Sequence, residues 1–255
     1  MELTEGLRGD GRWTLRLMLS EQLLRPVFAA LCDDIASSTR SGVADAVLGS
    51  AIVRRLIHWR TLMEKDGGGL GEEILRGLIG ELIILRDKVM PVYPLRDAVR
   101  CWTGPRGTPQ DFQLPDGRRW EVKAVARRAT QARINGLGQL DAGTMPLVLV
   151  VVRVEATGIH AAGALTAPLL IADLRQRLEA DPEGFAALNE NLAEIGWHEH
   201  PGHDEVVVRV CAIEEHTVTA GFPRLTSATV PPGILDASYL IELPAPGAAS
   251  RDGRS

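Results

Sequence analysis

Apolar and polar positions along the chain follow two different periods, and the changes between them predict where its elements lie. Residues 13–19 alternate between apolar and polar side chains, which is typical of a strand with one buried face. Helical spacing follows over about residues 26–38 and 43–63. The run Gly67-Gly68-Gly69 then ends the pattern, because glycine weakens both helices and strands.

This break predicts how the chain is organised. We expect a strand and a mainly helical region over residues 1–66, a core over residues 67–243, and a disordered tail over residues 244–255, which are rich in Pro, Gly, Ala and Ser. In order, the core should contain a helix near 71–89, an irregular proline-rich stretch, a buried strand over 144–155, helices over 168–180 and 181–196, paired strands over 205–213 and 216–220, and a last strand over 238–243.

The five residues Leu114-Pro115-Asp116-Gly117-Arg118 have the sequence of a tight turn between two strands. Pro115 suits the first turn position, and Gly117 can adopt the left-handed conformation that closes a three-residue loop. We therefore expect a β-hairpin with this longer loop. A two-residue turn at Asp116-Gly117 is the alternative, and it would shift the pairing by one residue.

The register of the hairpin decides which side chains share a face. With the longer loop, Phe112 lies opposite Trp120 and Asp111 lies opposite Glu121, and Lys123 follows on the face of Glu121. Two facing carboxylates repel each other, so this register needs a stabilising partner. A bound divalent cation would provide one. The shorter turn would instead send the two acids to opposite faces.

Glu81 lies in the helix expected near residues 71–89, where an apolar stripe is formed by Ile74, Leu78, Leu82 and Leu85. Because Glu81 falls on this stripe, its carboxylate would point inward in one of two arrangements. The alternative is a glutamate at the helix edge that reaches solvent or pairs with Lys88. Gly77 and Gly80 each weaken a helix by roughly 1 kcal/mol, and we interpret them as allowing the helix to pack closely on a sheet.

Composition and charge exclude several classes of protein. The hydrophobic content of 45% and charged content of 24% are ordinary for a globular chain. A net charge of −5 argues against a protein that coats nucleic acid, although a focused site remains compatible with it. Neither a membrane span nor a signal peptide is visible, so we expect a cytoplasmic protein. Three widely spaced cysteines predict neither a disulfide framework nor a zinc ribbon.

Basic residues gather on and after the hairpin, at Arg118, Arg119, Lys123, Arg127, Arg128 and Arg133. Such a patch could hold a DNA backbone, and a solvated arginine-rich face is the alternative. Lysine is otherwise confined to Lys65 and Lys88, so a compact ammonium at position 123 is notable. Gln139, in a glycine-rich loop, either approaches the same site or is an ordinary loop residue.

His198, His200 and His203 lie close together in the sequence and suggest zinc. Their spacing matches no established zinc motif. Because Pro201-Gly202 indicates a turn, we interpret the three as an incidental histidine-rich exposed loop.

Asp111 followed by Glu121-Val122-Lys123 resembles the motif of the PD-(D/E)xK nuclease superfamily, with Gln110 inserted between Pro109 and Asp111. Other segments resemble one branch of that superfamily, the DUF4420 family, and the similarity extends from about Trp13 to Leu243. These segments are Gly77-Leu78-Ile79-Gly80-Glu81-Leu82, Trp102-Thr103-Gly104-Pro105, Gln139-Leu140, Phe222-Pro223-Arg224-Leu225 and Tyr239-Leu240-Ile241-Glu242-Leu243.

The resemblance implies a restriction-endonuclease-like α/β core, in which a mixed sheet is flanked by helices. It also implies an endonuclease that hydrolyses phosphodiester bonds of DNA with Mg²⁺ or Mn²⁺. Asp111, Glu121, the backbone carbonyl of Val122 and Glu81 would hold the metal. Lys123 would orient the attacking water and stabilise the phosphate, with Gln139 nearby.

The expected context is a prokaryotic restriction or phage-defence system. Expected partners are DNA, a second copy of the chain, and a helicase-like ATPase or methyltransferase from the same operon. Two alternatives remain because a fold does not imply an activity. One is a catalytically silent, DNA-binding protein with a nuclease fold, and the other is a structural subunit whose N-terminal helices dock a larger assembly.

Overall fold

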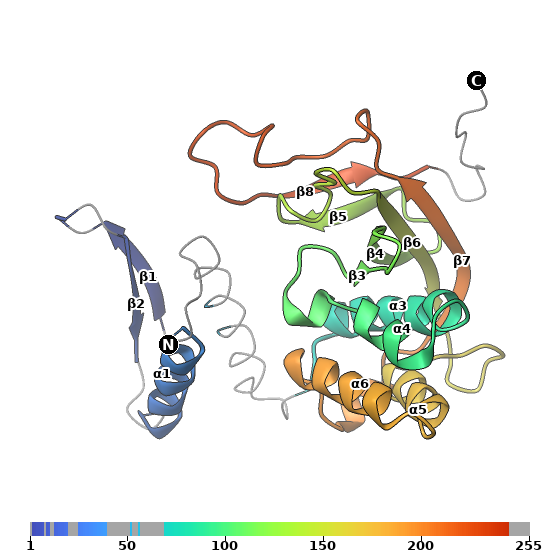
Figure 1. The fold of residues 1–255 in the computed structure, drawn as a ribbon. Coiled ribbons are helices and arrows are strands. Elements are labelled where there is room, and N and C mark those ends of the chain that lie inside the picture. The colour runs from blue at the N-terminus through green and yellow to red at the C-terminus, as the bar shows by residue number, and fades with distance from the viewer. Residues whose placement is uncertain are drawn as a thin grey trace. The chain divides into compact units, whose positions relative to one another are not determined.

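The computed structural model describes residues 2–7, 9–10, 13–19, 25–39, 52, 56 and 69–244. The chain divides into two compact units, Met1–Met63 and Glu64–Ser255, whose elements are drawn in Figure 1. Three expectations fall outside the described residues: the helix over 43–63 apart from positions 52 and 56, the boundary at Gly67, and the tail beyond Pro244.

The N-terminal unit contains a small sheet and a helix. Its strands β1 (Glu2–Leu7) and β2 (Trp13–Met18) pair antiparallel, and α1 (Arg25–Thr39) follows them. The strand predicted over 13–19 and the helix predicted over 26–38 are therefore confirmed. The pattern does not predict β1, because residues 2–7 lack a strict alternation and include a glycine.

A mixed four-stranded sheet forms the centre of the second unit, in the order β3-β4-β6-β7 (Figure 1). Its strands are β3 (Phe112–Gln113), β4 (Arg119–Ala126), β6 (Leu147–Ala156) and β7 (Val208–Thr217). The pair β4-β6 is parallel, and the pairs β3-β4 and β6-β7 are antiparallel. This arrangement confirms the expected α/β fold with a mixed sheet.

Different layers cover the two faces of this sheet. Val150, Val152 and Val154 of β6 belong to the apolar core shared with the helices, whereas Leu149 and Val151 belong to a second core shared with β5 (Gln131–Asn135) and β8 (Ser238–Glu242). Both faces of β6 are thus buried, which explains the continuous apolar run that predicted a central strand.

The helices of this unit share the first of these apolar cores. They are α3 (Glu72–Ile84), which continues into the π-helical turn η2 (Leu85–Val89), α4 (Leu95–Cys101), α5 (Ala167–Arg177) and α6 (Pro182–Glu194), with short 3-10 turns η3 (Gly104–Arg106) and η4 (Pro201–Asp204). Among the described residues, no helix has the length and apolar character that a membrane span requires.

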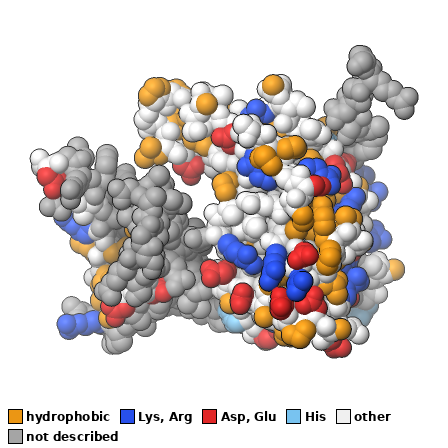
Figure 2. Space-filling model, viewed as in Figure 1, with side chains coloured by type: hydrophobic (Ala, Val, Ile, Leu, Met, Phe, Trp, Pro, Cys, Tyr) orange, Lys and Arg blue, Asp and Glu red, His pale blue; other side chains and the backbone are white. Residues whose placement is uncertain are grey.

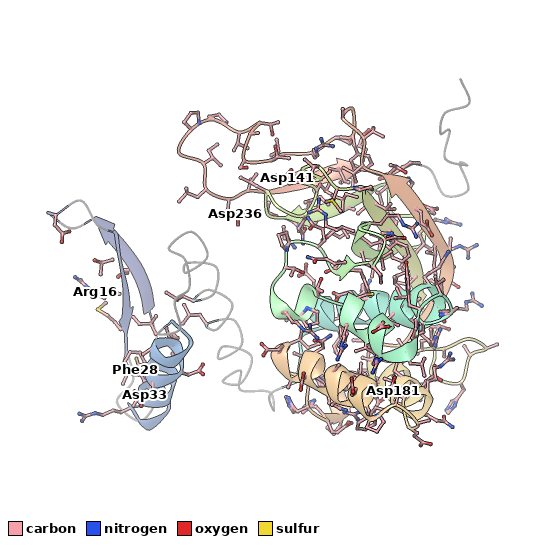
Figure 3. All side chains as sticks on the ribbon, viewed as in Figure 1. Arg16, Phe28, Asp33, Asp141, Asp181 and Asp236 are labelled. Atoms are coloured by element: carbon pink, nitrogen blue, oxygen red, sulfur yellow. The ribbon has the colours of Figure 1, made fainter. Side chains whose placement is uncertain are left out.

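Capping residues explain where α5 and α6 begin. The side chain of Thr166 accepts a hydrogen bond from the amide of Leu169, and that of Asp181, labelled in Figure 3, accepts one from the amide of Gly184. The predicted helices over 168–180 and 181–196 are confirmed to within three residues at each end.

The hairpin adopts the longer loop. Phe112 pairs with Trp120, and the amide of Leu114 donates to the carbonyl of Arg118 at 2.8 Å. Gly117 closes the loop with a φ of 86°, in the left-handed region. The predicted register is therefore correct, and the two-residue turn is excluded.

Two predicted elements are wrong. The two strands expected over 205–213 and 216–220 are one continuous strand, β7. The charged Glu214 does not interrupt it, because its side chain pairs with Arg153 of the neighbouring strand at 2.8 Å. The proline-rich stretch is not wholly irregular, since it contains α4. Pro94 lies at the N-cap of α4, where a proline precedes the helix without interrupting it.

The apolar stripe predicted on α3 is wrong at one residue. Ile74 is 43% exposed, although Leu78 and Leu82 are buried. Ile74 and Glu81 lie on one side of α3 about two turns apart. At Glu81 this side is covered by Trp102, which contacts its carboxylate, but the cover does not reach Ile74.

Candidate active site

Asp111 is the first residue beyond the paired part of β3, and its position is fixed by backbone hydrogen bonds. Its Oδ2 accepts from the amide of Val122 at 2.7 Å. Its own carbonyl accepts from the amides of Thr103 and Gly104 at 2.8 and 3.0 Å. The carboxylate is therefore attached to β4, and the backbone behind it is attached to the loop that follows α4.

Glu81 reaches the same place from α3. Its Oε2 accepts a hydrogen bond from Nε1 of the buried Trp102 at 2.7 Å. A Cβ added to Gly104 would lie 2.9 Å from Oδ1 of Asp111 and 3.5 Å from Oε2 of Glu81. The two carboxylates therefore border one small space, which the missing side chain of Gly104 leaves open. The alternative ion pair does not form, because Lys88 contacts Glu215.

Glu121 and Lys123 complete the group from β4. Glu121 is fully buried, and Nζ of Lys123 lies 2.8 Å from its Oε1. This contact is an ion pair without hydrogen-bond geometry, so neither Glu121 oxygen receives a hydrogen bond from the described residues. Lys123 instead donates to Oε1 of Gln139 at 3.0 Å. Of the two alternatives for Gln139, the structure shows the first, because the side chain contacts Lys123.

Burial raises the pKa of all three acids. The pKa of Glu81 rises to about 8 through burial and the nearby charge of Asp111. Burial raises the pKa of Asp111 to about 6, although the charge of Lys123 and the Val122 amide act in the opposite direction. The pKa of Glu121 lies well above its ordinary value for the same two reasons as that of Glu81. Such shifts gather where acids share a functional site.

The residues fit a hard divalent cation. The donors are all oxygens, Glu121 has two buried oxygens without hydrogen bonds, and Gly104 leaves space between the other two acids. A strand residue presents its amide and carbonyl to the same side, so the carbonyl of Val122 lies on the edge that faces Asp111. Among the described residues, no group of three or more His, Cys, Asp or Glu side chains is arranged so that these side chains alone could hold a metal ion. Mg²⁺ is commonly held by one or two carboxylates together with several waters. These acids can supply the carboxylates.

The predicted basic patch is only partly on the surface. Arg119 points inward, where it donates to Oε1 of Gln110 at 3.2 Å and to the carbonyl of Ala142. It holds the fold and is not placed to contact a ligand. The remaining arginines of the patch are largely exposed, and three have partners: Arg118 pairs with Asp116, Arg127 with Glu155, and Arg133 contacts Ser238.

The surface over α4 and α6 is also charged, but its positive and negative side chains are mixed. Over α4 and α6, Arg96 and Arg100 lie 3.4 and 3.3 Å from Glu183. Figure 2 shows basic and acidic side chains interspersed over the helices of this face. We therefore assign no nucleic-acid surface there.

The sequence suggested that the histidine segment is an exposed loop, and this is wrong for His203. His203 is fully buried, and its Nε2 accepts from the amide of Leu70 at 2.8 Å. A neutral His203 therefore carries its proton on Nδ1 and has no nitrogen left for a cation. His200 also accepts a backbone amide, that of Gly202. His203 thus fastens the start of the core unit, and among the described residues the three histidines form no group that could hold a metal ion.

Three residues of this site could not be assigned from the hairpin alone. Trp102 holds Glu81, Gly104 leaves the space between acids, and Gln110 ties two loops together. The only sequence signal for the first two is their place in a segment that resembles a known family. The signal for Gln110 is its insertion before Asp111.

A family model agrees with this geometry over nearly the whole chain. It matches residues 2–244, and its description is "Putative PD-(D/E)XK family member, (DUF4420)". The chain belongs to the DUF4420 family. No curated protein and no solved structure matches this DUF4420 protein. Its membership supports a nuclease-like core and a divalent metal.

Proposed function

We propose that this DUF4420 protein is a metal-dependent DNA endonuclease whose centre is formed by Asp111, Glu121 and Lys123, with Glu81 and Gln139 beside them. The observation that supports the proposal is the meeting of three acids with raised pKa values and one ammonium, brought together from α3, β4 and the segment before β3. A structural ion pair would require one acid for one lysine. Three acids beside one lysine carry an excess of negative charge when ionised, and a cation would neutralise it.

Asp111, Glu121 and the carbonyl of Val122 would hold Mg²⁺ or Mn²⁺, with Glu81 as a further ligand directly or through water. When bound, the ion would lower the pKa of a nearby water and offset negative charge on the phosphate.

The chain's own residues would orient the reactants. Lys123 lies between Glu121 and Gln139, so its ammonium is held at a defined place in the site. An N–H of Lys123 that Gln139 does not use can donate to a phosphate oxygen or to the attacking water. Gln139 is fixed in turn, because its Oε1 also accepts from the amide of Asn135 at 2.8 Å. An ammonium held in this way needs little reorganisation during the reaction.

The exposed arginines on the same part of the chain would contact the DNA backbone: Arg118, Arg127, Arg128 and Arg133. We further propose a cytoplasmic role in prokaryotic restriction or phage defence. Cutting both strands with one centre per chain requires a second copy or a second nuclease, so we propose a homodimer or a complex with an operon partner such as a methyltransferase or helicase-like ATPase.

The test is cleavage of supercoiled plasmid in Mg²⁺ or Mn²⁺. We expect Asp111→Asn, Glu121→Gln and Lys123→Ala each to lower the rate by about 100-fold or more, because each removes a charge needed at the phosphate. Matched controls are Asp116→Asn, in the exposed hairpin turn, and Lys88→Ala, a lysine 39% exposed that pairs with Glu215. Both should cut like the wild type.

Undiminished cutting by Asp111→Asn would remove the site assignment. A wild-type protein that binds the plasmid but leaves it intact in either metal would favour the catalytically silent alternative.

A further inference from the structure

Gln110 directly precedes Asp111, and its side chain is buried, with 1% exposure. Burying an amide costs free energy unless its donor and acceptor both find partners. Here both do. Its Nε2 donates to the carbonyl of Gly138 at 2.7 Å and, less closely, to that of Gln139 at 3.4 Å, while its Oε1 accepts from Nη1 of Arg119 at 3.2 Å.

These bonds join three segments that are separate in the sequence. One carries Asp111, one begins β4, and the third is the turn around Gly138. Packing strengthens the same junction, because a Cβ added to Gly138 would lie 3.1 Å from Cβ of Pro109. The segment before Asp111 therefore lies directly against the turn, with the amide of Gln110 as the polar link between them.

This turn carries Gln139, the residue that contacts the lysine of the site. Nζ of Lys123 lies 3.0 Å from Oε1 of Gln139 and 2.8 Å from Oε1 of Glu121. Glu121 is only two residues away on the same strand, so its contact cannot fix the lysine relative to another segment. The contact with Gln139 can. The position of the ammonium relative to Asp111 then depends on how the turn is attached to the Asp111 segment.

We propose that Gln110 is a positioning residue for the nuclease centre. The Val122 amide already holds the Asp111 carboxylate on β4, and the amide of Gln110 fixes where the longer Lys123 side chain ends by tying the Gln139 turn to the Asp111 segment. This inference rests on the proposed function. Gln110 acts through Gln139 and does not contact the substrate.

The position requires an amide. One end faces two carbonyl oxygens and needs a donor, and the other faces a guanidinium and needs an acceptor. Glutamate would keep the acceptor for Arg119 but place an oxygen against the carbonyls of Gly138 and Gln139. Methionine would fill a similar volume with no hydrogen bond. Both substitutions release the turn, and only glutamate keeps the bond to β4.

The experiment reads the lysine itself. The chain has three lysines, Lys65, Lys88 and Lys123, so protein labelled with ¹³C at lysine Cε gives few NMR signals, and Lys123→Ala identifies the one of interest. In Gln110→Glu and Gln110→Met, we expect this signal to move toward that of Lys88, whose side chain is more exposed than that of Lys123. Plasmid cleavage should fall about 100-fold in kcat, with KM changed by less than about twofold, because a small misplacement of a reacting group costs about that factor.

The control is Thr166→Ala, which removes the buried cap of α5 and should lower the melting temperature by a few degrees. It should leave the Lys123 signal and kcat unchanged. If the Gln110 variants lose stability as the control does, yet keep the wild-type Lys123 signal and kcat, Gln110 is only structural and the inference is overturned. If the wild type cuts no DNA, the proposed function fails, and the Lys123 signal still decides the role of Gln110.

Discussion

Two opposing requirements meet at the carboxylate of Glu81. Burial beside Asp111 raises its pKa to about 8, so without metal the group favours its protonated form at neutral pH. A cation requires the ionised form. Nε1 of Trp102, 2.7 Å away, donates to the carboxylate and so keeps its orientation in either state. Binding of the proposed metal would therefore require Glu81 to lose its proton.

Glu81→Gln should separate these two states. Glutamine keeps the shape and can still accept from Trp102, but it cannot ionise. We expect Mn²⁺ affinity, measured by calorimetry without DNA, to fall about tenfold, and plasmid cleavage to slow. The melting temperature of the metal-free protein at pH 8 should stay equal or rise, because a buried charge has been removed.

The matched control is Glu73→Gln, the same change at an exposed residue in the first turn of α3. It should leave Mn²⁺ affinity unchanged. A destabilised Glu81→Gln protein with wild-type affinity and cleavage would make Glu81 a structural partner of Trp102.

At this scale the sequence predicts contacts within one hairpin and leaves longer ones open. The turn chemistry of Gly117 predicts which face carries Asp111 and Glu121, because register follows from local geometry. The sequence left open whether Gln139 belongs to the site, because no local pattern indicates where its loop lies in the fold. The space beside Gly104 depends on residues from three segments, so no pattern of spacing reveals it.

Between elements, the packing of α3 on β4 decides where Glu81 sits. A Cβ added to Gly80 would lie 2.9 Å from Cβ of Ala124, closer than real Cβ atoms approach. Gly80 therefore allows the close packing that the sequence predicts for it. The same interpretation is wrong for Gly77, whose added Cβ would meet nothing within 4 Å.

These two glycines predict opposite effects of one substitution. Gly77→Ala should stabilise the protein by roughly 1 kcal/mol, because alanine favours the helix and meets no neighbour. Gly80→Ala gains the same propensity but must move α3 away from β4, at a cost of about 1–3 kcal/mol. We expect a net loss and slower plasmid cleavage, because Glu81 is the next residue.

Urea unfolding of the two variants at one pH measures the contrast. Equal stabilisation by both alanines would show that α3 does not need the glycine contact with Ala124, and that Glu81 is positioned in another way.

Elements with local signals are predictable from this sequence, and those formed through distant partners are less so. Capping residues and prolines predict α5 and α6. The charged residues of β7 suggest a break in the strand, and only the structure shows that Glu214 pairs with Arg153 across the sheet. β5 is short, and its partner β8 comes about a hundred residues later, so alternation within the segment gives only a weak signal.

For the whole molecule, burial of several acids links stability to pH. Glu81 has a pKa of about 8 in the folded state against an ordinary value of 4.5, and Asp111 about 6 against 3.8. The folded state therefore binds more protons than the unfolded state between these values, and stability falls as pH rises through them. His203 acts in the opposite direction. Its pKa is lowered from 6.5, so its contribution is complete above that pH and is lost as pH falls.

From pH 6.5 to 8 the acids dominate, because the His203 contribution is nearly complete there, while Glu81 still titrates. In EDTA, the free energy of unfolding should fall over this interval by up to about 2 kcal/mol for the Glu81 proton, at up to 1.36 kcal/mol per pH unit for each proton. Saturating Mg²⁺ should remove the fall, because metal binding displaces protons from the same oxygens and becomes tighter as pH rises. Glu81→Gln should flatten the metal-free profile without Mg²⁺. Metal-free stability that stays constant or rises from pH 6.5 to 8 in the wild type would mean that the acids are hydrated, and the case for a cation at this site would lose its electrostatic basis.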